Sequence, residues 1–164
     1  MTATYDKIAT TTLGSAASSY TFSTISGSYT DLILVFSTKL TSGSDGVNMQ
    51  FNGDTGSNYS FTYLSGNGTS ASSFRYANTA NIKAAFNGVP TTADGHLSIV
   101  QVNNYSNSTT YKTALVRDNN ANNGTGAIVG TWRNTAAITS IVLTAVSSTF
   151  TAGSTFTLYG IKAE

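Results

Sequence analysis

A segment rich in oxygen-bearing side chains, Asn52 to Asn58, is the first place in the sequence where a ligand could bind. Asn52, Asp54 and Asn58 follow the spacing of a calcium-binding loop, in which alternate residues of a tight turn direct oxygen atoms at one point. Gly56 and Tyr63 occupy positions where such a loop needs further ligands, so a single carboxylate would face a divalent cation. We therefore predict a turn between two strands, with Gly and Asn residues at positive φ, and no bound metal.

The single histidine, His96, is a candidate catalytic residue. It lies two residues after Asp94 in a serine-rich chain. A Ser-His-Asp hydrolase needs these residue types in a fixed geometry, but no nucleophile elbow of the G-x-S-x-G type occurs. The segment is better explained as a loop entering a strand. Glycoside hydrolysis requires a pair of carboxylates, and no pair stands out among the acids. These acids are Asp6, Asp31, Asp45, Asp54, Asp94, Asp118 and Glu164. We expect no catalytic residue, no cofactor and no enzymatic activity.

Aromatic residues beside amides offer a third kind of chemistry, because sugar-binding sandwiches stack pyranose rings on exposed Trp or Tyr. Tyr and Trp also serve sandwich cores and subunit interfaces, where they bury an apolar body and keep a polar tip bonded. Core or interface is the preferred interpretation, and a lectin-like groove remains an alternative. The aromatics beside amides are Tyr59, Tyr63, Tyr76, Tyr105, Tyr111 and Trp132.

The charge content excludes several classes of partner. Only 9% of the 164 residues are charged and the net charge is +1, whereas an average protein has roughly 25% charged residues. The Lys and Arg residues are scattered singly, so we expect no nucleic-acid partner.

No run approaches the roughly 20 apolar residues of a membrane span, and Met1 to Gly14 lacks the apolar stretch of a signal peptide. We expect a protein made in the cytoplasm, with no membrane partner. Without cysteine, disulfide and thiolate chemistry are absent.

Apolar residues alternate with a period of two, which indicates strands rather than helices. In the segment Asp31 to Leu40 both faces are apolar, so we expect a core strand covered on both sides. A short strand, rather than a helix, is expected at Asn81 to Phe86. Further strands, rich in β-branched and aromatic residues, are expected at Ser19–Ile25, Gly46–Phe51, Tyr59–Leu64, His96–Tyr105, Tyr111–Val116, Gly126–Trp132, Ile138–Val146 and Ser154–Ile161. Such spacing predicts one all-β domain over residues 1–164, a sandwich or barrel.

Several segments together resemble a family of small virion proteins and fibre-tip domains of tailed bacteriophages. They are YDKIATTTLGSAASSYTFSTI, YTDLILVFSTK, QFNGDTGSNYS, NNYSNSTTYKTALVR and FTLYGIKAE. The resemblance covers nearly the whole chain, and FNGDTGSNYS and FTLYGI are its most specific parts. It implies an antiparallel β-sandwich of jelly-roll type with about 8 to 11 strands and little or no helix, and it brings no catalytic residue.

The resemblance implies a non-enzymatic virion structural protein. The length favours a capsid decoration (cement) protein that bridges major capsid subunits as a homo-oligomer, with a trimer as one candidate. The alternative is a tail- or head-fibre domain that binds a receptor or carbohydrate. In either case the expected location is the virion and the expected partners are the major capsid protein or another virion protein. The candidate surface or interface contacts are Tyr5, Tyr59, Tyr63, Tyr105, Tyr111 and Trp132.

Overall fold

The computed structural model describes residues 4–43, 46–86, 88–93 and 95–162, and the regular elements within these ranges are all β-strands. Within these ranges there is accordingly no helix long and apolar enough to cross a membrane. The strands are β1 (Tyr5–Thr12), β2 (Ser19–Phe22), β3 (Asp31–Ser37), β4 (Val47–Phe51), β5 (Tyr59–Gly66), β6 (Ala71–Thr79), β7 (Ile82–Ala85), β8 (His96–Asn103), β9 (Lys112–Asn120), β10 (Gly124–Trp132), β11 (Ile141–Ala145) and β12 (Thr155–Ile161).

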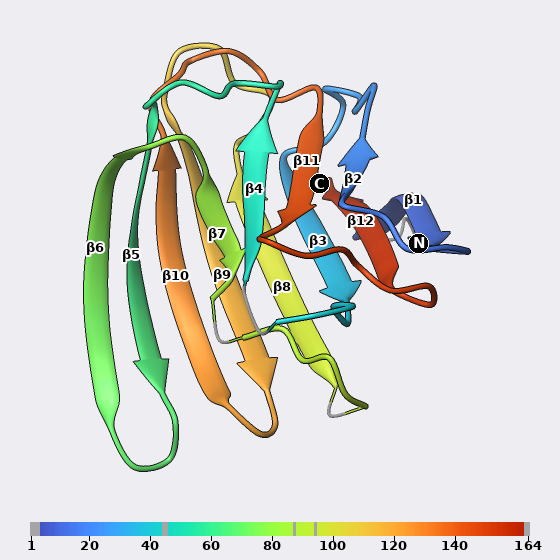
Figure 1. The fold of residues 1–164 in the computed structure, drawn as a ribbon. Coiled ribbons are helices and arrows are strands. Elements are labelled where there is room, and N and C mark those ends of the chain that lie inside the picture. The colour runs from blue at the N-terminus through green and yellow to red at the C-terminus, as the bar shows by residue number, and fades with distance from the viewer. Residues whose placement is uncertain (1–3, 44–45, 87, 94, 163–164) are drawn as a thin grey trace.

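The strands form two antiparallel sheets that pack face to face (Figure 1). The larger sheet has the order β1-β12-β3-β8-β9-β10-β5-β6 and the smaller the order β2-β11-β4-β7. Among β1, β3, β8 and β12 of the larger sheet and the four strands of the smaller sheet, the chain changes sheet at every step except from β4 to β7. This order of crossings, with the sheet orders β1-β12-β3-β8 and β2-β11-β4-β7, is the jelly-roll topology. The predicted fold class, an antiparallel jelly-roll sandwich, is confirmed.

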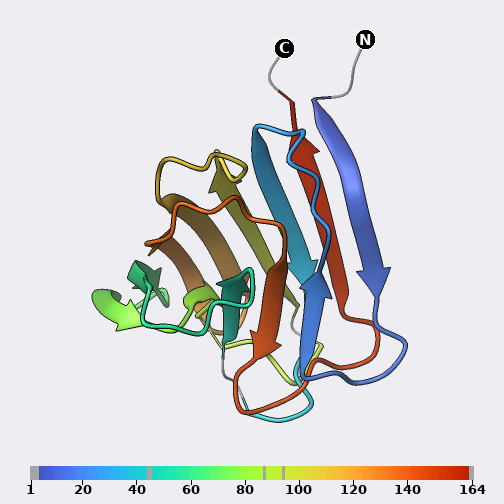
Figure 2. The same ribbon diagram turned by 90° about the horizontal axis from the view of Figure 1, so that it is seen from above.

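Two hairpins are inserted into this jelly roll and extend its larger sheet. The hairpin β5–β6 lies between β4 and β7 in the chain, and β9–β10 lies between β8 and β11. The two hairpins join where β10 pairs with β5, for example Val129 with Thr62. Seen from above, the extended sheet curves around the smaller one (Figure 2). The inserted hairpins raise the total above the predicted range, to twelve strands in the described residues.

Two of these strands, β1 and β6, were not predicted from the sequence. Both contain few apolar residues and both are edge strands of the larger sheet. An edge strand needs less apolar surface because it is half solvated, so its alternation is weak. The short strand expected at Asn81 to Phe86 is confirmed as β7.

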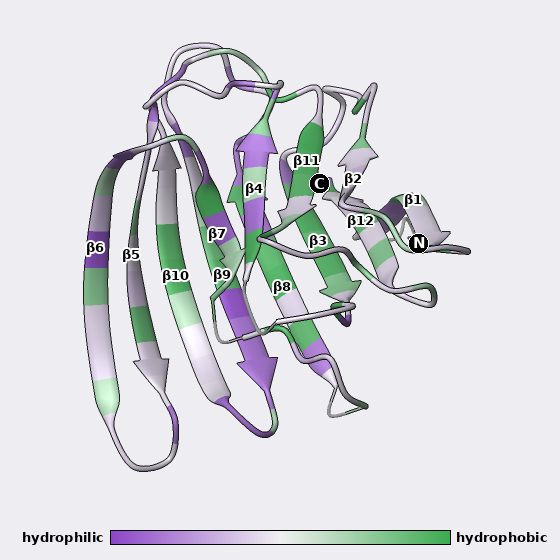
Figure 3. Ribbon diagram, viewed as in Figure 1, coloured by the Kyte–Doolittle hydropathy of each residue, from purple (hydrophilic) through white to green (hydrophobic). Residues whose placement is uncertain are grey.

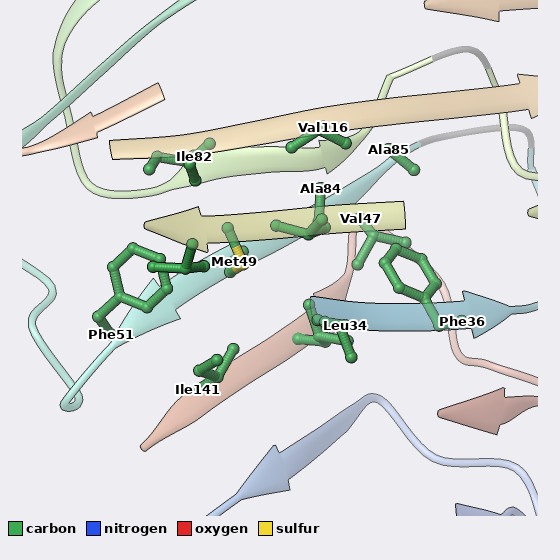
Figure 4. Packing of buried hydrophobic residues seen from close by; sticks show 14 of the residues in the cluster. Leu34, Phe36, Val47, Met49, Phe51, Ile82, Ala84, Ala85, Val116 and Ile141 are labelled. Carbon is green, nitrogen blue, oxygen red and sulfur yellow. The ribbon is translucent and has the colours of Figure 1, made fainter. Parts of the chain in front are cut away.

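The core lies between the two sheets and follows the alternation along each strand. Leu34 and Phe36 of β3 face Met49 of β4 and Ile141 of β11 across this layer (Figure 4). The central strands β3, β8, β10 and β11 carry the most apolar segments, whereas parts of β4 and β9 are hydrophilic (Figure 3). Hydrophobic burial of this kind is the main stabilising term of the fold.

The prediction that β3 is covered on both faces is wrong for the described chain. Leu32, Leu34 and Phe36 are buried, but Ile33 and Val35 on the other face are only half-buried. The smaller sheet covers one face of β3, and no second layer of the described chain covers the other.

Candidate functional site

The loop after β4 is a tight turn, as its sequence predicts. Asn52 and Gly53 have φ values of 52° and 67°, and the Asp54 amide donates to the Phe51 carbonyl over 2.9 Å. Positive φ at both central residues defines a type I′ turn, for which Asn-Gly is the favoured pair. The Asn52 side chain also bridges to the segment before β11, since its Oδ1 accepts from the Thr139 amide over 2.8 Å.

The carboxylate of Asp54 is fully engaged by donors of the protein. Its Oδ2 accepts from Trp132 Nε1 over 2.7 Å and from Asn58 Nδ2 over 2.9 Å, and its Oδ1 accepts from the Gly56 amide over 2.8 Å. The hydrogen bond from Trp132, followed by those from Asn58 and Gly56, lowers the pKa of Asp54. These hydrogen bonds connect the loop to itself and to Trp132 of β10. The arrangement supports the interpretation of the loop as architecture.

Trp132 and Tyr59 form an aromatic cluster beneath this loop. Their rings stack with centroids 6.2 Å apart, and Phe51 lies 5.6 Å from Trp132. The Tyr59 hydroxyl accepts from the Phe51 amide over 3.0 Å and donates to the Asp54 carbonyl over 3.1 Å. Burial raises the pKa of Tyr59 to about 12. Both side chains are therefore part of the core that holds the loop in place.

The six candidate surface aromatics divide into two groups. Tyr59, Tyr63, Tyr105 and Trp132 are buried. The Tyr105 hydroxyl, for example, donates to the Ser26 carbonyl. The expectation that these four side chains contact a partner at the surface is therefore corrected. They occupy inward-facing strand positions or pack beneath loops, where a partner cannot reach them. Tyr5 and Tyr111 are exposed, at 56% and 57%.

His96 is a buried residue of the inner face of β8, not an accessible base. Its Nδ1 lies 3.3 Å from the Thr38 hydroxyl, and its Nε2 has no hydrogen-bond partner in the described chain. Burial lowers the pKa of His96 to about 4, and the charge of Asp118 on β9 opposes this shift only in part. Asp94, the other half of the candidate pair, lies outside the described residues.

The described carboxylates other than Asp54 also have structural partners. Asp6 accepts from Lys162 Nζ over 2.8 Å, Asp31 accepts from the Asn104 amide over 2.7 Å, and buried Asp118 accepts from the Phe86 amide over 2.8 Å. Within the described ranges, no three His, Cys, Asp or Glu side chains gather as metal ligands would.

The most apolar exposed surface lies on the side of the larger sheet that faces away from the smaller one. We call it the outer face. Two adjacent rows of register partners run across β3, β8, β9, β10 and β5 and carry most of its apolar side chains. The apolar residues of the outer face are Ile33, Val35, Leu64, Leu97, Ile99, Leu115, Ala127 and Val129, and the same rows also contain the polar residues Thr62, Gln101 and Arg117. Val129 is 52% exposed, although a valine at the centre of a sheet is usually covered.

A groove lies on the opposite side of the same extended sheet, where the inner face of β5–β6 passes the edge strand β7. It encloses about 400 Å³ between the edges of the two sheets. Phe61, Tyr76 and Phe86 form its aromatic side. Its polar side comes from Asn48, Thr79, Asn81 and Lys83.

The outer face was not predicted as a site from the sequence, and of the groove only Tyr76 was named, among the aromatics of the alternative lectin-like groove. The alternation in β8, β9 and β10 does place Leu97, Leu115 and Val129 on the second face of each strand. That signal was visible, but the sequence could not show that this face lacks a covering layer.

No known protein family matches the chain, and no curated protein matches it. Among solved structures, it is similar to alginate lyase Aly36B in complex with an alginate trisaccharide, at 10% identity over 93% of this chain and 80% of the lyase chain, with a TM-score of 0.38. A second structure of the same lyase gives 10% identity over 94% and 80% of the two chains, with a TM-score of 0.34. Similarity at this level carries no argument about activity or substrate.

Proposed function

We propose that this protein is a non-enzymatic virion structural protein of a tailed bacteriophage, a decoration protein that attaches to the capsid through its outer face. The observation that carries the proposal is the uncovered apolar surface of β3, β8, β9, β10 and β5. Large contiguous apolar patches on a soluble protein mark interaction sites. The partners are the major capsid protein or another virion protein, together with further copies of this chain as a homo-oligomer.

The chemistry of the described carboxylates supports a role without catalysis. Asp6, Asp31, Asp54 and Asp118 each accept a hydrogen bond from another part of the chain. Groups held in this way maintain loops and strand ends. The buried position of His96 supports the same proposal, because a general base must reach the proton that it abstracts.

The outer face is tested by placing a charge in its centre. Val129→Glu should leave folding intact, since the side chain is exposed, but should abolish rebinding of the purified protein to particles stripped of it. Burial of an unpaired carboxylate in an apolar contact is strongly unfavourable. The matched control is Thr21→Glu, on the exposed face of the smaller sheet. Rebinding by Val129→Glu at wild-type level would refute attachment through the outer face.

The decoration role itself is tested by copy number. Quantifying this protein against the major capsid protein in purified virions should give a ratio near that of a shell component. A ratio corresponding to only a few fibres per particle would refute the decoration role.

The second candidate is a tail- or head-fibre domain that binds a receptor or carbohydrate. Trp132, the side chain that the sequence suggested for such binding, is buried and does not support it. The specific observation in its favour is the aromatic groove beside β7, where Tyr76 is 40% exposed.

A further inference from the structure

We propose that the groove between β5–β6 and β7 binds a pyranose unit of a glycan. Its aromatic platform consists of Tyr76 and Phe86, backed by Phe61, and its rim consists of Asn48, Thr79, Asn81 and Lys83. This site is separate from the proposed attachment through the outer face. It exists because β5–β6 extends the larger sheet past the edge of the smaller one.

Tyr76 is the exposed ring of the platform, and buried rings hold it and the half-buried Phe86 in place. Tyr76 stacks on Phe61 with centroids 5.0 Å apart, and the centroids of Tyr76 and Phe86 lie 6.3 Å apart. Phe86 packs 4.2 Å from Tyr63. Rings fixed in this way lose little conformational entropy when a ligand binds. Tyr76 is 40% exposed, so the platform remains accessible.

Polar groups surround the platform on the side of β4 and β7. The segment between β6 and β7 is held by two hydrogen bonds, from Gln50 Nε2 to the Ala80 carbonyl over 2.9 Å and from the Thr79 hydroxyl to the Asn81 carbonyl over 2.8 Å. The Asn48 side chain lines the groove beside this segment.

A pyranose fits this combination better than an apolar ligand does. One face of a sugar ring presents C–H groups, which pack on the electron-rich face of an aromatic ring. Its hydroxyls both donate and accept hydrogen bonds, as the amides and hydroxyl of the rim require. A purely apolar ligand would desolvate the rim without pairing it. The groove volume of about 400 Å³ lies within the range of small-molecule sites.

Saturation-transfer NMR of the full chain with three trisaccharides tests the proposal. The probes are chitotriose, mannotriose and trigalacturonate at millimolar concentration, so that an N-acetylated, a neutral and an acidic pyranose are compared. We expect transfer to the C–H protons of at least one probe. In Tyr76→Ala the affinity should fall about tenfold, which corresponds to the loss of one aromatic contact. Tyr76→Phe keeps the ring and should retain binding.

Tyr111→Ala is the matched control, because it removes a tyrosine that lies outside the groove and is even more exposed than Tyr76. It should bind as the wild type does. Absence of transfer to all three probes would overturn the proposal, as would equal affinity in wild type and Tyr76→Ala. Binding of an aromatic dye but of no sugar would also overturn it and would assign a hydrophobic docking patch instead. Thermal melting confirms that each variant is folded, and copy number in the virion is an independent measurement that this test does not affect.

Discussion

The single histidine allows a sharp test of the buried core, because it is the one side chain whose ordinary pKa lies between pH 5 and 8. Burial lowers the pKa of His96 from 6.5 to about 4 in the folded protein. The unfolded chain therefore binds a proton below pH 6.5, whereas the folded chain resists protonation until about pH 4. The stability contributed by neutral His96 is complete above pH 6.5 and is lost as the pH falls from 6.5 toward 4.

The size of this loss follows from the pKa values of His96 in the folded and unfolded chains. A tenfold difference in proton affinity between the two states corresponds to about 1.4 kcal/mol, so lowering the pH from about 7.5 to about 4.5 should reduce the free energy of unfolding by about 2.5 kcal/mol. For a chain of this length the melting temperature should fall by about 5 to 10 °C.

Urea unfolding at 25 °C, monitored by tryptophan fluorescence at several pH values across this interval, measures the effect. The variant His96→Gln cannot be protonated there, so its stability should be lower at neutral pH but nearly constant across the interval. A wild-type stability that does not change between these pH values would refute the argument. So would a His96→Gln variant that keeps the full pH dependence.

Four further predictions concern the loop, a packed glycine, metal and attachment. Trp132→Phe should destabilise the fold by about 1 to 3 kcal/mol in urea unfolding, because it removes the 2.7 Å hydrogen bond to a charged acceptor, Asp54; a loss within error would show that the loop does not depend on it. Gly160→Ala should cost about 1 to 3 kcal/mol, since its added Cβ would lie 2.3 Å from the Tyr29 ring, and the cost should shrink in a Tyr29→Ala background. Excess chelator and added calcium should give the same melting temperature, and a large difference would show that the Asn52 to Asn58 loop binds metal. Particles washed at 1 M salt should keep the protein as they do at 0.1 M, because an apolar contact is little affected by a Debye length that falls from about 10 Å to about 3 Å; release at high salt alone would point to ion-paired attachment.

The sequence alone determined the strand class and the local turn geometry. Alternation along β3, β4, β8 and β12 is a property of each segment by itself, so it could be detected without knowing which strands pair. The turn at Asn52 and Gly53 was equally predictable, because positive φ at consecutive residues favours these two residue types. Because the prediction depended on alternation within each segment, it missed the edge strands β1 and β6, whose segments carry little alternation.

Only the tertiary structure decided which side chains are available to a partner. Tyr63 and Phe74 are register partners on the same face of the larger sheet, yet Tyr63 is buried and Phe74 is half exposed. Both residues are large and aromatic, so residue type alone does not distinguish them. The two side chains differ in exposure because the smaller sheet ends at β7, which contacts β5. The edge strand β6, next to β5, has an open inner face. Exposure depends on where the covering layer ends, and that boundary is set by contacts between strands distant in sequence.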